Sequence, residues 1–177
     1  SRNPALYDEF RAPESEIINK SFYSDAKKVF CQSLFHKQII ENNLGLKNLI
    51  NLSGNLWPVH TLRVLKLLNK HSKTDKTSIL DSPIGHKNTT TAESYCQLKK
   101  VAYEKIKAGD YHDGKFLFIP KTPETLSRVV VEAKMMGIKV ITNRNVGASY
   151  EDWFHLSGFD LIDKMVEKRS SIIFHIH

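Results

Sequence analysis

The chain has 177 residues, of which 41% are hydrophobic, 25% charged and 10% aromatic, so it can form one hydrophobic core or two small ones. This composition excludes collagen, a long coiled coil and general disorder, and no apolar run reaches the roughly 18–20 residues of a membrane-spanning helix. Lys and Arg number 26 against 19 Asp and Glu, and this net charge of +7 suits nucleic acid, an anionic membrane surface or a phosphate-bearing ligand.

The basic residues are scattered along the sequence. The densest groups are Lys99-Lys100 and residues 66–76, and neither is interleaved with the aromatic residues that a groove for single-stranded nucleic acid requires. We therefore expect a solvated basic surface and regard nucleic acid as a disfavoured partner.

Cysteine and histidine spacing argues against a metal site. Cys31 and Cys96 stand far apart without a Cys-x-x-Cys motif, which fits a reducing cytosol and buried apolar roles. His175 and His177 would share one face of a strand, but no third ligand is near them in sequence. We expect no metal and no other cofactor.

The first predicted elements form a strand–helix–strand unit. Residues 28–32 are predicted as a strand, and residues 34–44 as a helix with its apolar positions on one face. Ser33 is the expected N-cap of this helix and Gly45 its left-handed C-terminal residue. A second strand is expected at residues 48–52.

A second unit begins near Trp57, where Pro58 suits the first turn of a helix. The apolar side of that helix is expected to consist of Leu62, Leu65, Leu67 and Leu68. The elements predicted after it are a strand at 77–81, a polar loop at 82–91, a helix ending near 108–109, a strand at 115–119, a helix around 129–136 that ends at Gly137, and a strand at 139–142.

This alternation of strands and helices predicts an α/β fold, a Rossmann-like parallel sheet with helices on both faces. The strand at 115–119 is apolar on both sides, as a central parallel strand should be. Ligands of such sheets bind outside the carboxyl ends of the strands, so the loops at 82–91, 120–128 and 143–152 are the candidate site.

Two carboxylates flank the start of one predicted helix. Glu124 precedes the helix, and Glu132 lies eight residues later inside it. Backbone N–H groups at a helix start bind anions, and carboxylates accept hydrogen bonds from sugar hydroxyls. Eight helical residues rise about 12 Å, which is the length scale of a nucleotide sugar.

The pattern Pro-Glu-x7-Glu-Ala-x3-Gly at residues 123–137, followed by the strand at 139–141 and by Asn-Arg-Asn-Val-Gly at 143–147, resembles a known family. It is similar to the donor-binding half of retaining GT-B glycosyltransferases, closest to the bacterial polysaccharide-type enzymes of the family-four (group 1) type. Residues 1–56 resemble the remnant of an acceptor-side domain and residues 57–177 the nucleotide-sugar-binding domain. The resemblance thus implies one half of a GT-B fold, and we take Ser1 as a cut point.

The resemblance implies a role for each residue of the motif. Glu124 would contact the donor sugar, Glu132 the ribose hydroxyls, and Lys87 would stabilise the leaving diphosphate as charge develops. The backbone N–H groups that would face the diphosphate are those of Leu126, Ser127 and Arg128.

The implied reaction transfers a sugar from a nucleotide-diphosphate sugar to a glycan, lipid-linked or protein acceptor, without a metal. Its implied place is the cytoplasm or the inner membrane face. We expect this fragment alone to be inactive, because most of the acceptor domain is missing from it.

The sequence departs from the family pattern at two places. Thr-Leu-Ser at residues 125–127 replaces the usual Gly-x-Gly, so side chains crowd the approach of the diphosphate. Asp81-Ser82 replaces a usual Gly-Arg, and Arg128 and Arg144 are the candidates for the missing phosphate-binding cation.

Plainer interpretations stand beside these roles. Glu124 can be a carboxylate favoured by the helix dipole, Glu132 a solvent-facing residue and Lys87 one surface lysine among many. We expect Trp57 and Trp153 to be packing anchors rather than platforms for a sugar. The alternative functions are a non-catalytic basic α/β module that binds nucleic acid or a protein, and another GT-B enzyme such as a nucleotide-sugar epimerase or a phosphorylase.

Overall fold

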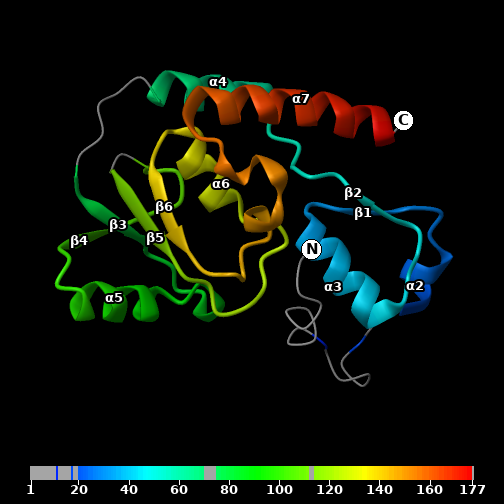
Figure 1. Cartoon of the computed structure of the whole chain (residues 1–177), viewed down its shortest axis with the longest axis horizontal. Helices are drawn as coiled ribbons and strands as arrows, with labels where there is room; N and C mark the ends of the chain where they lie inside the picture. Colours follow the sequence, from blue (N-terminus) through cyan, green and yellow to red (C-terminus); the bar gives the residue numbers. More distant parts are fainter. Residues whose placement is uncertain (1–10, 12–16, 18–19, 70–74, 112–113, 177) are drawn as a thin grey trace.

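The computed structural model describes residues 11, 17, 20–69, 75–111 and 114–176. These residues form a two-stranded and a four-stranded sheet, both parallel, with helices packed around them (Figure 1). The strands are β1 (Val29–Cys31), β2 (Leu49–Asn51), β3 (Thr77–Leu80), β4 (Tyr103–Ile106), β5 (Lys115–Phe118) and β6 (Lys139–Thr142). The α-helices are α2 (Lys20–Asp25), α3 (Leu34–Leu44), α4 (Val59–Leu68), α5 (Thr89–Leu98), α6 (Arg128–Met135) and α7 (Gly158–Ile176), and the short 3-10 helices are η2 (Gly85–Lys87), η3 (Gly147–Tyr150) and η4 (Asp152–His155).

The larger sheet has the strand order β4-β3-β5-β6, and every neighbouring pair is parallel. Helix α5 covers one face, whereas α6, with α4 and α7 outside it, covers the other (Figure 1). The predicted α/β class, a Rossmann-like parallel sheet with helices on both faces, is therefore confirmed.

Side chains of β5 explain why this strand is apolar on both sides. Phe116 and Phe118 pack into the main core with α4, α6 and α7. Leu117 points the other way and packs with Cys96 of α5. Successive residues of a strand face opposite sides of the sheet, so a central strand covered on both faces has no polar side.

The smaller unit consists of β1, α3 and β2, and its predicted details are confirmed. Ser33 is the N-cap of α3, because its hydroxyl accepts the His36 N–H at 3.1 Å. Gly45 follows the helix with a φ of +67°, a left-handed conformation that a residue without Cβ adopts readily.

The helix predicted to end near residues 108–109 is wrong in its second half. Helix α5 ends at Leu98, Lys100 turns the chain with a φ of +53°, and β4 then pairs with β3. No Gly or Pro lies between residues 99 and 102, so the sequence carries no breaker that announces this end. Pairing with β3 decides the conformation of the segment, and Ile106 joins the main core.

Two further expectations are wrong. Leu67, expected on the apolar side of its helix, is exposed. His175 lies in α7 and not on a strand, while His177 lies outside the described residues. The sequence patterns predict no helix at residues 158–176, where the structure has α7. The buried side chains of α7 pack on α4 and α6.

Membrane-spanning helices need a sufficient length and a sufficiently apolar sequence, and the described helices lack this combination. None of them, including the 19-residue α7, combines the length and the hydropathy needed to cross a membrane.

Candidate functional site

The predicted site residues lie at the carboxyl edge of the larger sheet. Lys87 ends η2, which follows β3, and Glu124 lies in the loop that follows β5. Their side chains meet, with Lys87 Nζ 2.6 Å from Glu124 Oε1. The two side chains are only 22% and 12% exposed, so this is a largely desolvated ion pair. The structure thus brings together two residues that stand 37 positions apart.

The backbone around Glu124 is held by the loop after β6. The Glu124 N–H donates to the Asn145 carbonyl at 2.7 Å, and the Gly147 N–H donates to the Glu124 carbonyl at 3.0 Å. Lys87 Nζ also lies 5.7 Å from the centre of the Phe118 ring, a cation–π distance. Glu124 Oε2 accepts no hydrogen bond from the described residues, so this oxygen can accept from a hydroxyl.

Glu132 is bound within a separate network on α6. Its Oε1 accepts from Trp57 Nε1 at 2.9 Å and from Arg128 Nη2 at 2.9 Å. The Arg128 guanidinium lies 5.8 Å from the centre of the Trp57 ring. Glu132 is 15% exposed, which contradicts the interpretation as a solvent-facing residue. Arg128, a candidate for the missing phosphate cation, already pairs with Glu132.

The start of α6 has unpaired polar groups. The N–H groups of Leu126, Ser127 and Arg128 have no hydrogen-bond acceptor in the described part of the chain. Ser127 has a left-handed φ of +71°, and its buried hydroxyl also lacks a partner there. Backbone N–H groups at a helix start are the donors that bind anions, whereas the Ser127 hydroxyl is enclosed by the fold. The Leu126 side chain packs in the main core, so it does not show the crowding of the diphosphate approach that the sequence predicts.

Residues of the smaller unit hydrogen-bond to the segment just before α6. The sequence patterns do not predict these contacts. The Ser33 hydroxyl donates to the Thr125 carbonyl, and the Thr125 hydroxyl donates to Gln32 Oε1 at 2.6 Å. A Cβ at Gly147 would lie 2.2 Å from the Thr125 carbonyl oxygen, so only glycine fits there. The sequence patterns also assign no role to Glu151, since nothing in the local sequence distinguishes it from Asp152.

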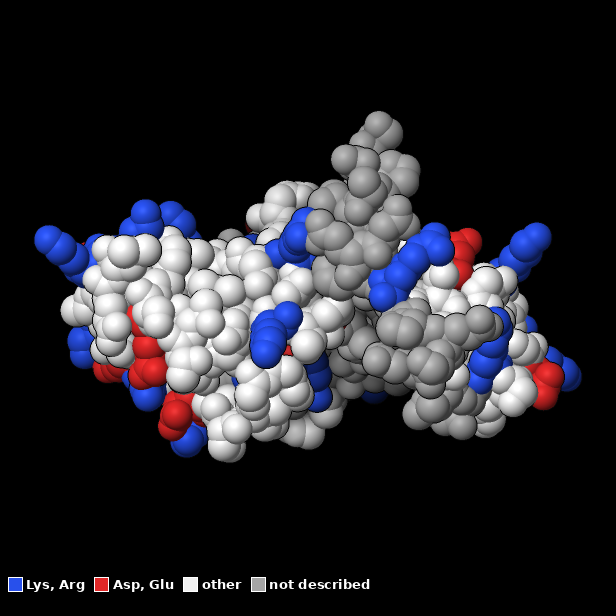
Figure 2. Space-filling model, turned by 90° about the horizontal axis from the view of Figure 1, so that it is seen from below, with Lys and Arg blue, Asp and Glu red and all other residues white. Residues whose placement is uncertain are grey.

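Asp81 follows β3, at the position where the sequence has Asp-Ser instead of the Gly-Arg expected from the resemblance. It pairs with Lys107 at 2.6 Å, and the hydrogen bond from Lys107 lowers the pKa of the Asp81 carboxyl. Arg144, the other cation candidate, lies in the loop after β6 at the same edge of the sheet. The basic side chains form no single patch on the face in Figure 2, where blue and red residues are dispersed among neutral ones.

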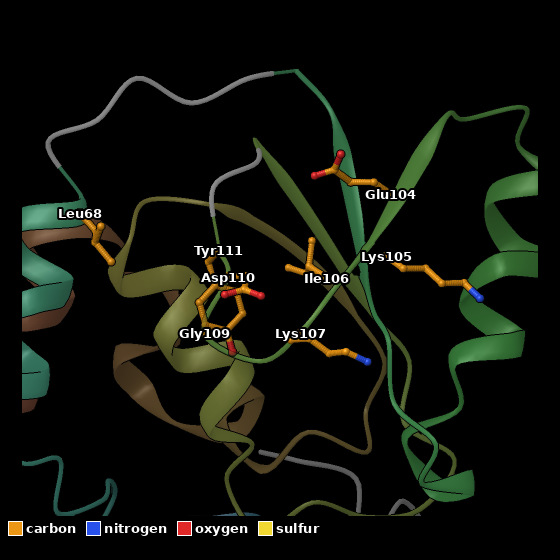
Figure 3. Close-up of a pocket in the computed structure, with 8 residues that line it drawn as sticks. All are labelled: Leu68, Glu104, Lys105, Ile106, Lys107, Gly109, Asp110 and Tyr111. Atoms are coloured by element: carbon orange, nitrogen blue, oxygen red, sulfur yellow. The ribbon is translucent and has the colours of Figure 1, made fainter.

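A pocket of about 550 Å³ lies beside the carboxyl half of β4 (Figure 3). It contains neither glutamate of the motif nor Lys87, so the structure does not place these three residues in this pocket. Tyr111, one of its lining residues, is buried, and burial together with the negative charge of Glu132 raises the pKa of the Tyr111 hydroxyl.

Within the described ranges, no group of three or more His, Cys, Asp or Glu side chains could hold a metal ion. Trp57 and Trp153 are both 1% exposed, which confirms their role as packing anchors.

Comparison with known proteins gave no relatives. No protein-family model matches the chain, and neither the curated proteins nor the solved structures contain a significant match.

Proposed function

We propose that the chain is the donor-binding part of a retaining glycosyltransferase, which transfers a sugar from a nucleotide-diphosphate sugar to a glycan, lipid-linked or protein acceptor. The observation that carries the proposal is the Lys87–Glu124 pair beside the start of α6, where three backbone N–H groups have no acceptor among the described residues. This combination offers donors to a diphosphate and a carboxylate to a sugar.

The diphosphate in this proposal binds at the start of α6. Lys87 supplies the positive charge that offsets the charge developing on the leaving diphosphate, and the helix start supplies aligned N–H groups. Because Lys87 is held by Glu124 and Phe118, it is already positioned before the ligand arrives. Such positioning lowers the cost of reorganisation during the reaction.

Glu124 and Glu132 bind the two sugars in this proposal. Each glutamate uses Oε1 for contacts within the chain and has no partner among the described residues at Oε2. A free carboxylate oxygen accepts a hydroxyl hydrogen bond, which fits the donor sugar for Glu124 and the ribose for Glu132. Trp57 and Arg128 fix the orientation of Glu132.

The direct test is calorimetric titration of the chain with UDP, GDP and dTDP. We expect binding of at least one diphosphate and about tenfold weaker binding by Glu132→Gln, since one charge-assisted hydrogen bond is weakened. Glu93→Gln is the matched control, because Glu93 is an acidic residue of α5 that pairs with Lys105. Unchanged affinity in Glu132→Gln would remove the role of that residue.

A wild-type chain that binds none of the three diphosphates would contradict the proposal. Binding of RNA or DNA that falls steeply with salt and shows no nucleotide preference would instead support a basic interaction module.

A further inference from the structure

We infer that Glu151 is a positioning residue, whose buried carboxylate joins the β1–α3–β2 unit to the loops that hold Glu124. The inference rests on the proposed function for its consequence on nucleotide binding, but its structural part is independent of that function.

The carboxylate of Glu151 connects three segments of the smaller unit. Its Oε1 accepts the Leu34 N–H at 2.5 Å and Asn51 Nδ2 at 3.3 Å, and its Oε2 accepts the Ser53 hydroxyl. The residue is 7% exposed. Because Leu34 is the first residue of α3, the carboxylate also lies at the positive end of that helix dipole. A residue 117 positions away thus completes the cap that Ser33 begins.

Neighbours of Glu151 strengthen the same junction. Trp153 Nε1 donates to the Ser53 carbonyl and lies 2.9 Å from both that oxygen and the Ser53 hydroxyl. Tyr150 stacks on Phe35 of α3 with ring centres 4.5 Å apart and planes 6° from parallel. Three residues within a four-residue stretch, Tyr150, Glu151 and Trp153, therefore contact the smaller unit or the residues just after it, and Glu151 is the charged one among them.

The junction is connected to the candidate site by a short series of hydrogen bonds. The Glu151 N–H donates to the Ala148 carbonyl at 3.1 Å, and the Ala148 N–H donates to the Leu126 carbonyl at 2.9 Å. A second route runs from the α3 cap, where the Ser33 hydroxyl donates to the Thr125 carbonyl. Both routes end on the segment between Glu124 and the start of α6, so a displaced Glu151 changes the position of that segment.

The chemistry of the junction requires a carboxylate rather than an amide. All three partners of Glu151 act as donors in this arrangement, and a carboxylate has acceptor sites only. A glutamine keeps only one acceptor oxygen, so its NH₂ group would face either the nitrogen donors or the Ser53 hydroxyl, which would then have to accept instead of donate.

The test is hydrogen–deuterium exchange of Glu151→Gln and Ser53→Ala. We expect the hydrogen-bonded backbone amides of Leu34, His36, Glu124 and Ala148 to exchange about tenfold faster than in the wild type, while β3 and β5 keep their protection. Ser53→Ala removes a single donor and serves if Glu151→Gln does not fold. Glu167→Gln is the control, because it changes an exposed ion pair of α7. We expect its amides to exchange as in the wild type.

Two exchange results would overturn the inference. One is wild-type exchange at the amides of Glu124 and Ala148 in Ser53→Ala or in a folded Glu151→Gln. The other is faster exchange spread over β3 and β5 in Ser53→Ala, which marks a general loss of stability.

Binding of UDP, GDP and dTDP separates this inference from the proposed function. We expect Ser53→Ala to bind the preferred diphosphate about tenfold more weakly than the wild type. If the wild type binds none, the proposed function fails, while the exchange result still decides the structural role of Glu151.

Discussion

Lys87 and Glu124 lose most of their hydration where they meet at the edge of the sheet. A pair of this kind stabilises the fold little as a whole, because desolvation offsets the attraction between the charges. Removal of one partner has a larger effect, since it leaves the other charge buried without compensation.

Lys87→Met is therefore expected to lower the free energy of unfolding by about 1–3 kcal/mol, which urea denaturation measures. The double variant Lys87→Met/Glu124→Gln should recover part of this loss, because it removes the uncompensated charge. Lys107→Met is the control, since Lys107 forms a well-exposed pair with Asp81 and should change stability by less than about 0.5 kcal/mol. Equal losses of unfolding free energy in Lys87→Met and Lys107→Met would contradict the conclusion that the Lys87–Glu124 pair is desolvated.

The buried thiol of Cys31 leads to a prediction of how its reactivity and the stability of the protein depend on pH. Burial disfavours the thiolate and raises the pKa of Cys31 to about 11 from its ordinary 9.0. At about pH 8 only about a thousandth of the native thiol is ionised, so alkylation by iodoacetamide should be slow until the chain unfolds. Because the unfolded state loses this proton first, the free energy of unfolding should fall as the pH rises from about 9 towards 11.

Mass spectrometry after timed alkylation, with and without guanidinium chloride, measures the reactivity of this thiol. Rapid alkylation of Cys31 in the native protein would show that the thiol is accessible.

At the scale of elements, the loop after β6 decides how the two units meet. Gly147 lies where this loop crosses Thr125, and the close approach leaves no volume for a side chain. Ser33, from the other unit, lies at the same crossing. Three segments that are distant in sequence therefore share one contact.

Gly147→Ala should lower the free energy of unfolding by about 1–3 kcal/mol, because its Cβ would lie 2.6 Å from Ser33 Oγ and still closer to the Thr125 backbone. Gly85→Ala is the matched control: its Cβ would meet no atom within 4 Å. Denaturant midpoints of the two variants measure the difference. A Gly147→Ala protein as stable as Gly85→Ala would contradict this packing.

At the scale of the whole molecule, the two sheets are joined by buried polar contacts as well as by the chain. The hydrogen bonds of Ser33, Ser53 and Glu151 cross this junction, and Trp153 reports on it because its indole donates to Ser53. Shared buried contacts favour cooperative unfolding.

We expect one unfolding transition, with tryptophan fluorescence and far-ultraviolet circular dichroism giving the same midpoint. Trp57 reports from the main core and Trp153 from the junction, so fluorescence follows both. A fluorescence change at lower denaturant than the loss of helix would show instead that the smaller unit separates first.

The sequence by itself determined the fold class, most strands, and the caps of α3, because these depend on local hydrophobic patterns and on the conformations of single residues. It also predicted that Lys87 and Glu124 lie in loops at one edge of the sheet, since parallel strands bring their carboxyl ends there, whereas the pairing of β3 with β5 makes these loops neighbours. Their roles in sugar transfer stay a prediction.

Only the tertiary structure decided the rest. Residues 103–106 form a strand because they pair with β3. Glu132 accepts a hydrogen bond from Trp57 because α4, which follows Trp57, packs beside α6. Glu151 found its donors in a unit about a hundred positions earlier in the chain. The free energy of a buried polar group depends on which atoms surround it after folding, and a local sequence pattern does not contain that information.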